Sequence, residues 1–235
     1  MSLGESRQPK SVAQQMRRSR TRGGSSSQTA ARILILLDVL GLPVEHPCPV
    51  PNAIRVVRSL TRLEKLDFWL RNPDYLADEL MTEYEEGRLP EGVVREHVQR
   101  MLGELAAAHH YPMIRFHFGA YEVVDNALAK LKATGLIAHR RGADSGDRAR
   151  HDYYLLSKGA DQAELMRGSL LELEWYDKQA DAIAFLSEAM QGSAARKRQY
   201  EQPEYKGARI GSEIPSIFER ARTRASELGL VKGKE

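Results

Sequence analysis

The sequence has few of the features that mark common enzymes and membrane proteins. Its single cysteine, Cys48, excludes an intramolecular disulfide and makes a structural zinc site unexpected. No run approaches the roughly 20 consecutive apolar residues that cross a bilayer, because the most apolar stretch, 33–42, contains Asp38. Phosphate-binding loops, nucleophile elbows and zinc-binding helix motifs are also absent from the sequence. We therefore expect a cytoplasmic protein that is not an enzyme and that carries no metal or cofactor.

Positive and negative side chains nearly balance each other, with 35 Lys and Arg residues against 32 Asp and Glu residues. The small excess lies at the N-terminus, where residues 1–31 carry six basic side chains and one acidic side chain. Because the whole chain carries +3, the remaining residues carry −2. We expect 1–31 to be a disordered basic tail that attracts nucleic acid without sequence preference.

Most of the sequence after this tail has the apolar spacing that is typical of helices. The expected helices span residues 33–40, 53–71, 73–86, 93–108, 120–134 and 160–190. The acidic residues of the helix 73–86 share one face, which we expect to be solvated. The helix 160–190 is long enough to project from the domain, with a bend near Gly168. A basic linker and a short helix from Pro215 end the chain.

The segment 120–165 has the order of elements of a winged helix-turn-helix. Its first helix ends at Gly135, and two strands follow, joined by a polar turn over 142–150. Ser157 is placed to cap the next helix. The fold class expected is mostly α, with a small β-hairpin wing, extra N-terminal helices and a long C-terminal helix. The expected divisions are the tail 1–31, a helical winged-helix domain over 32–192, and a linker with a terminal helix over 193–235.

Two resemblances to known families add to this interpretation. The arginine-rich run 140–150 and the run Tyr154-Leu-Leu-Ser-Lys-Gly159 resemble the wing of the MarR and PadR families. The runs 33–38 and 62–73, with the loop that ends at Pro51, are similar to the middle component of bacterial ABC-three-component systems. Such components are small subunits encoded beside an SMC- or RecN-like ATPase, and Lamassu-type defence operons carry a similar accessory subunit. This resemblance spans about 32–165, and it implies an ATPase and an effector as partners.

Two functions remain open at this level. One is a non-enzymatic winged-helix subunit that bridges the ATPase and its effector in antiphage or anti-plasmid defence and contacts DNA. The alternative is a dimeric MarR- or PadR-like transcription regulator. The helix 120–134 presents Glu122, Asp125 and Asn126 where a helix that reads a DNA groove is usually basic, and this favours the subunit. The residues expected to contact phosphate are Arg140, Arg141, Arg148 and Arg150, and Lys130 and Lys132 are also expected to bind nucleic acid.

A protein interface is expected along the long helix, because its apolar seam exceeds what a small domain needs for its own core. The residues expected at this interface, with a second copy or a coiled-coil partner, are Met166, Leu170, Leu173, Ile183 and Met190. His109 and His110 form the densest group of histidines, but adjacent helical residues point about 100° apart and make a poor metal site.

Overall fold

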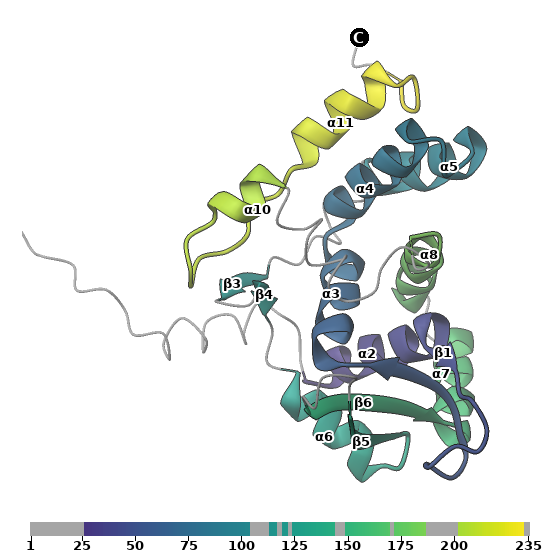
Figure 1. The fold of residues 1–235 in the computed structure, drawn as a ribbon. Coiled ribbons are helices and arrows are strands. Elements are labelled where there is room, and N and C mark those ends of the chain that lie inside the picture. Colours follow the sequence, from purple (N-terminus) through teal and green to yellow (C-terminus); the bar gives the residue numbers. More distant parts are fainter. Residues whose placement is uncertain are drawn as a thin grey trace, which may run out of the picture.

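The computed structural model describes residues 26–103, 113–116, 119–121, 124–143, 149–169, 172–186 and 202–232. Helices predominate, and they surround a small antiparallel sheet (Figure 1). The mostly helical class predicted from the sequence is confirmed. Within the described residues, no helix is both long and apolar enough to cross a membrane.

The main sheet has four strands in the order β1-β2-β6-β5, and all neighbouring pairs are antiparallel. The strands are β1 (Leu42–Pro43), β2 (Ala53–Arg58), β5 (Ile137–Ala143) and β6 (Ala149–Leu156). One face carries the buried side chains of Val57, Ile137 and Leu155 towards the main core. Two further strands, β3 (Ile114–Phe116) and β4 (Gly119–Tyr121), form a separate small hairpin.

Helix α2 (Ser26–Leu40) is the centre of the core. Its residues 33–37 are each at most 1% exposed, as expected for a helix that is apolar on all sides. It contacts β2 and β6, and also the three helices α6 (Asp125–Ala133), α7 (Ser157–Ser169) and α8 (Glu172–Ala184). The helix begins earlier than predicted, so 26–30 are ordered and only the earlier part of the expected tail lies outside the described residues.

The helices around α2 form one group, and a second group lies on the side of α3 away from the sheet (Figure 1). It contains α4 (Pro73–Glu85), α5 (Glu91–Met101), α10 (Pro203–Gly207) and α11 (Phe218–Glu227), and α3 (Leu60–Arg71) joins it to the sheet. Tyr205 of α10 is fully buried, and its ring meets that of Phe68 edge to face at 5.4 Å between centroids. The segment 202–232 is therefore part of the core, whereas the sequence suggested an extension after a linker.

The expected helix over 53–71 is wrong in its first third, where β2 forms. Ile54 and Val57 are three residues apart, which fits a helix, but the β-branched run pairs with β6 instead. Ser59 separates the strand from α3, with a positive φ of 77°. Its hydroxyl accepts a hydrogen bond from the Arg62 backbone N–H and so caps the helix.

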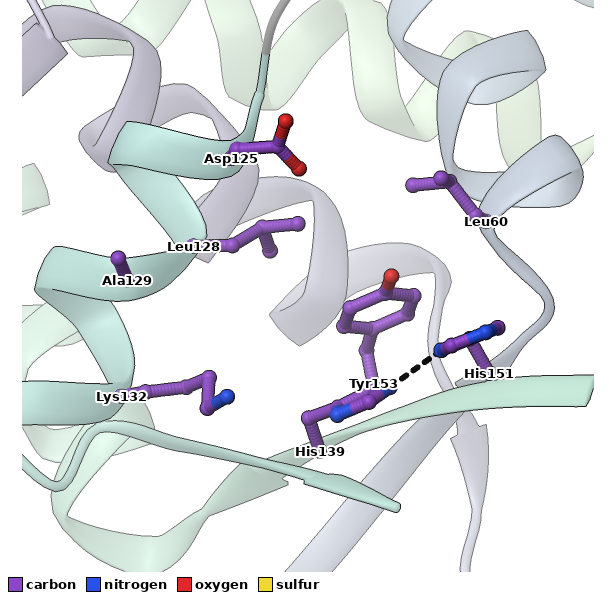
Figure 2. A pocket seen from close by; sticks show the side chains of 8 residues that line it. All are labelled: Leu60, Asp125, Leu128, Ala129, Lys132, His139, His151 and Tyr153. Atoms are coloured by element: carbon purple, nitrogen blue, oxygen red, sulfur yellow. Dashed lines mark hydrogen bonds between the residues drawn. The ribbon is translucent and has the colours of Figure 1, made fainter. Parts of the chain in front are cut away.

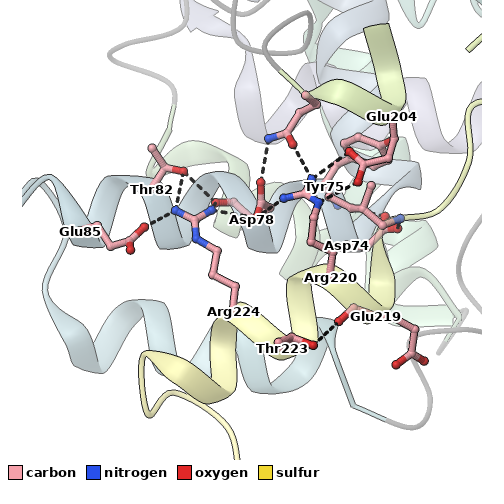
Figure 3. A network of polar contacts seen from close by, with 12 residues as sticks. Asp74, Tyr75, Asp78, Thr82, Glu85, Glu204, Glu219, Arg220, Thr223 and Arg224 are labelled. Carbon is pink, nitrogen blue, oxygen red and sulfur yellow. Dashed lines mark hydrogen bonds and ion pairs between the residues drawn. The ribbon is translucent and has the colours of Figure 1, made fainter. Parts of the chain in front are cut away.

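Most of the acidic face of α4 is buried, which contradicts the expected solvated face, although Glu85 and Glu86 at its end are exposed as expected. Asp78, Glu79 and Glu83 are each at most 5% exposed. Figure 3 shows why for Asp78, whose carboxylate accepts hydrogen bonds from Arg220 and Arg224 of α11. Gln202 donates a third bond, of 2.7 Å, to the same carboxylate. The charge of Asp78 is therefore neutralised by a helix from the far end of the chain, whereas Glu83 is bound by the nearby Arg88.

The expected helix 160–190 is two helices, α7 and α8, and it does not project. Arg167 of α7 forms ion pairs with Asp38 of α2, at 2.8 Å, and with Asp177 of α8, at 2.7 Å. Ala180 and Ile183 of α8 are fully buried in the core beside α2. The apolar seam is therefore used within the chain itself.

Candidate functional site: the β5–β6 hairpin and helix α6

The β5–β6 hairpin places basic side chains on both of its faces. Arg140 is exposed, and its guanidinium donates to the Pro49 carbonyl at 2.7 Å, which ties the hairpin to the proline-rich loop. Arg141 is exposed on the opposite face, paired across the strands with His151. Arg148 lies outside the described residues.

The buried Asp152 carboxylate organises the outer face of the hairpin. Arg150 binds it with two hydrogen bonds, of 2.7 and 3.0 Å, and Arg58 of β2 approaches to 3.8 Å. Arg140 is the cross-strand neighbour of Asp152. Two guanidinium groups therefore share one carboxylate and Arg140 lies beside them, so this face keeps an excess of positive charge although Arg150 itself is paired.

The two lysines expected to bind nucleic acid lie in the last turn of α6, where the helix dipole stabilises cations. Lys130 is exposed and donates to the Ser27 hydroxyl of α2 at 3.2 Å. Lys132 is also exposed and points towards β5 (Figure 2). Asp125 and Asn126 are exposed at the other end of the helix, so the described exposed surface of α6 is close to neutral.

A cavity of about 280 Å³ lies between α6 and the hairpin (Figure 2). Side chains of α6 form one wall of the cavity, β5 and β6 contribute three aromatic rings, and α3 contributes one leucine. The lining residues are Leu60, Asp125, Leu128, Ala129, Lys132, His139, His151 and Tyr153. The cavity thus adjoins the helix and the hairpin that the sequence singled out for nucleic-acid contact.

Two histidines from adjacent strands meet at this cavity. Nε2 of His139 and Nδ1 of His151 are 2.8 Å apart, and the rings stack with 5.0 Å between centroids and an angle of 11°. One nitrogen must donate and the other accept, so at least one of the facing nitrogens carries no proton. Burial, the nearby His151 and Lys132 together lower the pKa of His139, so its ring favours the uncharged form.

Tyr153 stands beside the histidines with its ring 5.2 Å from that of His139. Burial raises the pKa of the Tyr153 phenol, and the carboxylates of Asp125 and Glu64 raise it further. The hydroxyl therefore keeps its proton and remains a hydrogen-bond donor. Burial likewise raises the pKa of Glu64 to about 7, with Asp67 and Asp125 adding to the shift.

The sequence did not indicate the His139–His151 pair, because the two residues are twelve positions apart and only the strand register brings them together. The predicted hairpin was the available signal, since residues on one face of paired strands become neighbours. His109 and His110 lie outside the described residues. Across the described part of the chain, no three or more His, Cys, Asp or Glu side chains are grouped to hold a metal ion.

The expected protein interface is only partly described, and its described members turn inward. Leu173 and Ile183 are buried, and Met166 is half-buried against the core. Leu170 and Met190 lie outside the residues whose side chains are described. Leu173 and Ile183 offer no surface to a partner in this structure, because the chain's own core covers them.

Compared with family models, with curated proteins and with solved structures, the chain gives no match in any of the three.

Proposed function

We propose that this protein is a non-enzymatic winged-helix subunit that joins an SMC/RecN-like ATPase to an effector in a bacterial defence complex. In this proposal the β5–β6 hairpin is the wing, and it contacts DNA through the phosphate backbone. The residue resemblances at 33–38 and 62–73 supply the identity of the partners. The topology and the charges of the described residues support the remaining parts.

The strand order supports the winged-helix assignment. Helix α2 is followed by β2, and α6 leads directly into the β5–β6 hairpin, whose second strand pairs with β2. Of the three strands β2, β5 and β6, the first in the chain, β2, therefore lies beside the last, β6. Helices α2 and α6 pack together. Helix α6 occupies the position of a recognition helix, and the segment from α3 to β4 is inserted before it.

The run 62–73 fits a structural part of this subunit. Asp67 of α3 accepts hydrogen bonds from Arg32 of α2, the shorter at 2.5 Å, and both side chains are at most 3% exposed. Lys65 reaches the Tyr205 hydroxyl at 3.3 Å. The charged residues of this run therefore hold α2, α3 and α10 together, so the resemblance concerns the fold of the subunit.

The observation that favours a subunit over a dimeric regulator is the burial of α8. A regulator of the MarR or PadR kind needs the apolar seam of the long helix as its dimer interface, but Ile183 and Ala180 are fully buried within one chain. The described surface of α6 also lacks the several base-reading side chains that discrimination by about 4–10 kcal/mol requires.

The test is purification of the tagged full-length protein from its native operon. The proposal expects a large coiled-coil ATPase and a second subunit to co-purify in fixed ratio. A parallel selection of random duplexes on the purified protein should return no motif. Recovery of a palindromic motif bound at nanomolar affinity, with no co-purifying ATPase, would contradict the proposal and favour the regulator.

A further inference from the structure

We propose that the cavity between α6 and the β5–β6 hairpin binds one nucleotide, either free or as an unpaired unit of a single strand. This inference goes beyond the proposed function, because it assigns a ligand class to a site that needs neither the ATPase nor the effector. It rests on the charges, the rings and the polar groups that line the cavity.

The cavity has a cationic end and an anionic end. Asp125 and Lys132 are two turns apart on α6, or about 10 Å along its axis, and Figure 2 shows them at opposite ends of the space. Arg141 and Lys132 both act on His139 as nearby positive charges, so this end attracts an anion. Asp125 can accept hydrogen bonds from N–H donors at the other end.

Between these ends, His139, His151 and Tyr153 form a wall of rings. Flat aromatic ligands stack on such rings whatever their hydrogen-bonding pattern, and stacking on aromatic side chains is the usual way in which proteins hold unpaired bases. Leu60 and Leu128 add apolar surface beside the rings. A base fits this middle part better than an aliphatic chain, which would leave the polar ring atoms unpaired.

The polar groups of the cavity are available to a ligand. Among the described residues, the Lys132 ammonium, the Asp125 carboxylate and the Tyr153 hydroxyl make no hydrogen bond or ion pair. Lys130, on the same helix, is by contrast bound to Ser27. Three polar groups that converge on one cavity without partners of their own are what a specific ligand site requires.

The backbone at the rim is also held in an uncommon conformation. Ser59 has a φ of 77°, and its N–H donates to the His151 carbonyl at 3.0 Å. This residue fixes Leu60 and His151, which are both lining residues. Strained positive-φ residues persist where the surrounding structure over-determines them, and they cluster at ligand sites.

These features match one nucleotide and disfavour other ligands. A nucleotide combines a flat base, N–H donors on that base and an anionic phosphate, which correspond to the rings, to Asp125 and to Lys132. A divalent metal on the two histidines would face the Lys132 ammonium, which repels it. The volume, about 280 Å³, is close to the small end of the range for ligand pockets, so it suits a single nucleotide better than a dinucleotide held entirely inside.

The experiment is calorimetric titration of the full-length protein with each common 2′-deoxynucleoside 5′-monophosphate, with a short single-stranded oligonucleotide and with its duplex. Ala129→Trp should fill the cavity and abolish binding, because Ala129 is an exposed lining residue of α6. Lys132→Met should weaken binding by about 10- to 100-fold, as expected for loss of a hydrogen bond to a charged group. The matched controls are Ala133→Trp, at an exposed residue of the same helix, and Lys178→Met, at an exposed lysine of α8, because neither residue lines the cavity.

Saturable binding of monophosphates that is lost in the cavity variants and kept in the controls supports a free nucleotide as the ligand. The same pattern with the single strand alone supports an unpaired unit of DNA. Absence of saturable binding by both probes, or equal losses in cavity variants and controls, overturns the proposal. Co-purification of the ATPase with the Ala129→Trp protein tests the proposed function separately, because that variant leaves the rest of the surface unchanged.

Discussion

Replacing Ile183 by alanine tests whether α8 belongs to the core or to an interface between chains. Ile183 is fully buried, and α8 packs on α2, while Arg167 of α7 forms ion pairs with both of these helices. Ile→Ala changes in such positions cost about 2–5 kcal/mol. For a chain of 235 residues, each kcal/mol shifts the Tm by about 2–4 °C, so a cost of about 3 kcal/mol predicts a Tm lower by about 6–12 °C.

The assay is thermal unfolding followed by far-UV circular dichroism, with the molar mass measured by light scattering at the same concentrations. Leu165→Ala on α7 is the matched control, because Leu165 is 63% exposed and its loss should change stability by less than about 0.5 kcal/mol. The interpretation is refuted if Ile183→Ala leaves the Tm unchanged but converts a dimer into a monomer. That result would show that α8 is an interface between chains and would favour the alternative function of a dimeric transcription regulator.

Two further predictions concern the hairpin and α3. The double variant Arg140→Glu and Arg141→Glu should lower the slope of log affinity for duplex DNA against log salt by nearly one unit for each lost phosphate contact. The control Arg209→Glu, at another exposed arginine, should leave this slope unchanged. Equal slopes in the unaltered protein, the double variant and the control would show that the hairpin does not contact the DNA. The pKa of Glu64 rises from 4.5 to about 7 on folding, so stability is fully present below pH 4.5 and falls as the pH rises from 4.5 through 7. Glu64→Gln should therefore raise the free energy of unfolding by about 1–3 kcal/mol near pH 8 and leave it nearly unchanged near pH 4 in urea titrations, and a gain of equal size at both pH values would contradict this.

The sequence predicted best where apolar spacing and turn residues agreed. Val124, Leu128 and Leu131 are buried as expected, and the helix ends at Gly135, whose φ of 67° suits glycine. The hairpin that follows was also predicted, although β2 extends it into a larger sheet. These features depend on neighbours in the sequence, which explains why spacing alone was sufficient.

The errors arose where distant residues decide the outcome. The face that carries Asp78 was expected to be solvated, since its main cationic partners lie far away in the sequence. The partners of Asp78, Arg220 and Arg224, come from more than 140 positions away. Likewise, β2 was predicted as helix because its strand partner, β6, is far along the chain.

The cavity shows the same limit for the candidate site. Lys132 was predicted to bind nucleic acid; the structure places it in the lining of the cavity, and its role there stays a prediction. The sequence could not predict that His139 and His151 lie in the same site, because their contact depends on the register of β5 and β6 and not on their separation in the sequence.

The contact between Lys65 and Tyr205 has a consequence for how the chain is made. The two residues are 140 positions apart, so at 5–20 residues per second the ribosome adds Tyr205 about 7–28 s after Lys65. During that interval the emerging α3 and α4 carry ionic groups whose final partners have not been synthesised. We therefore expect the sheet and α2 to fold around α6 to α8 first, and α3 to α5 to become protected only when the last helices arrive.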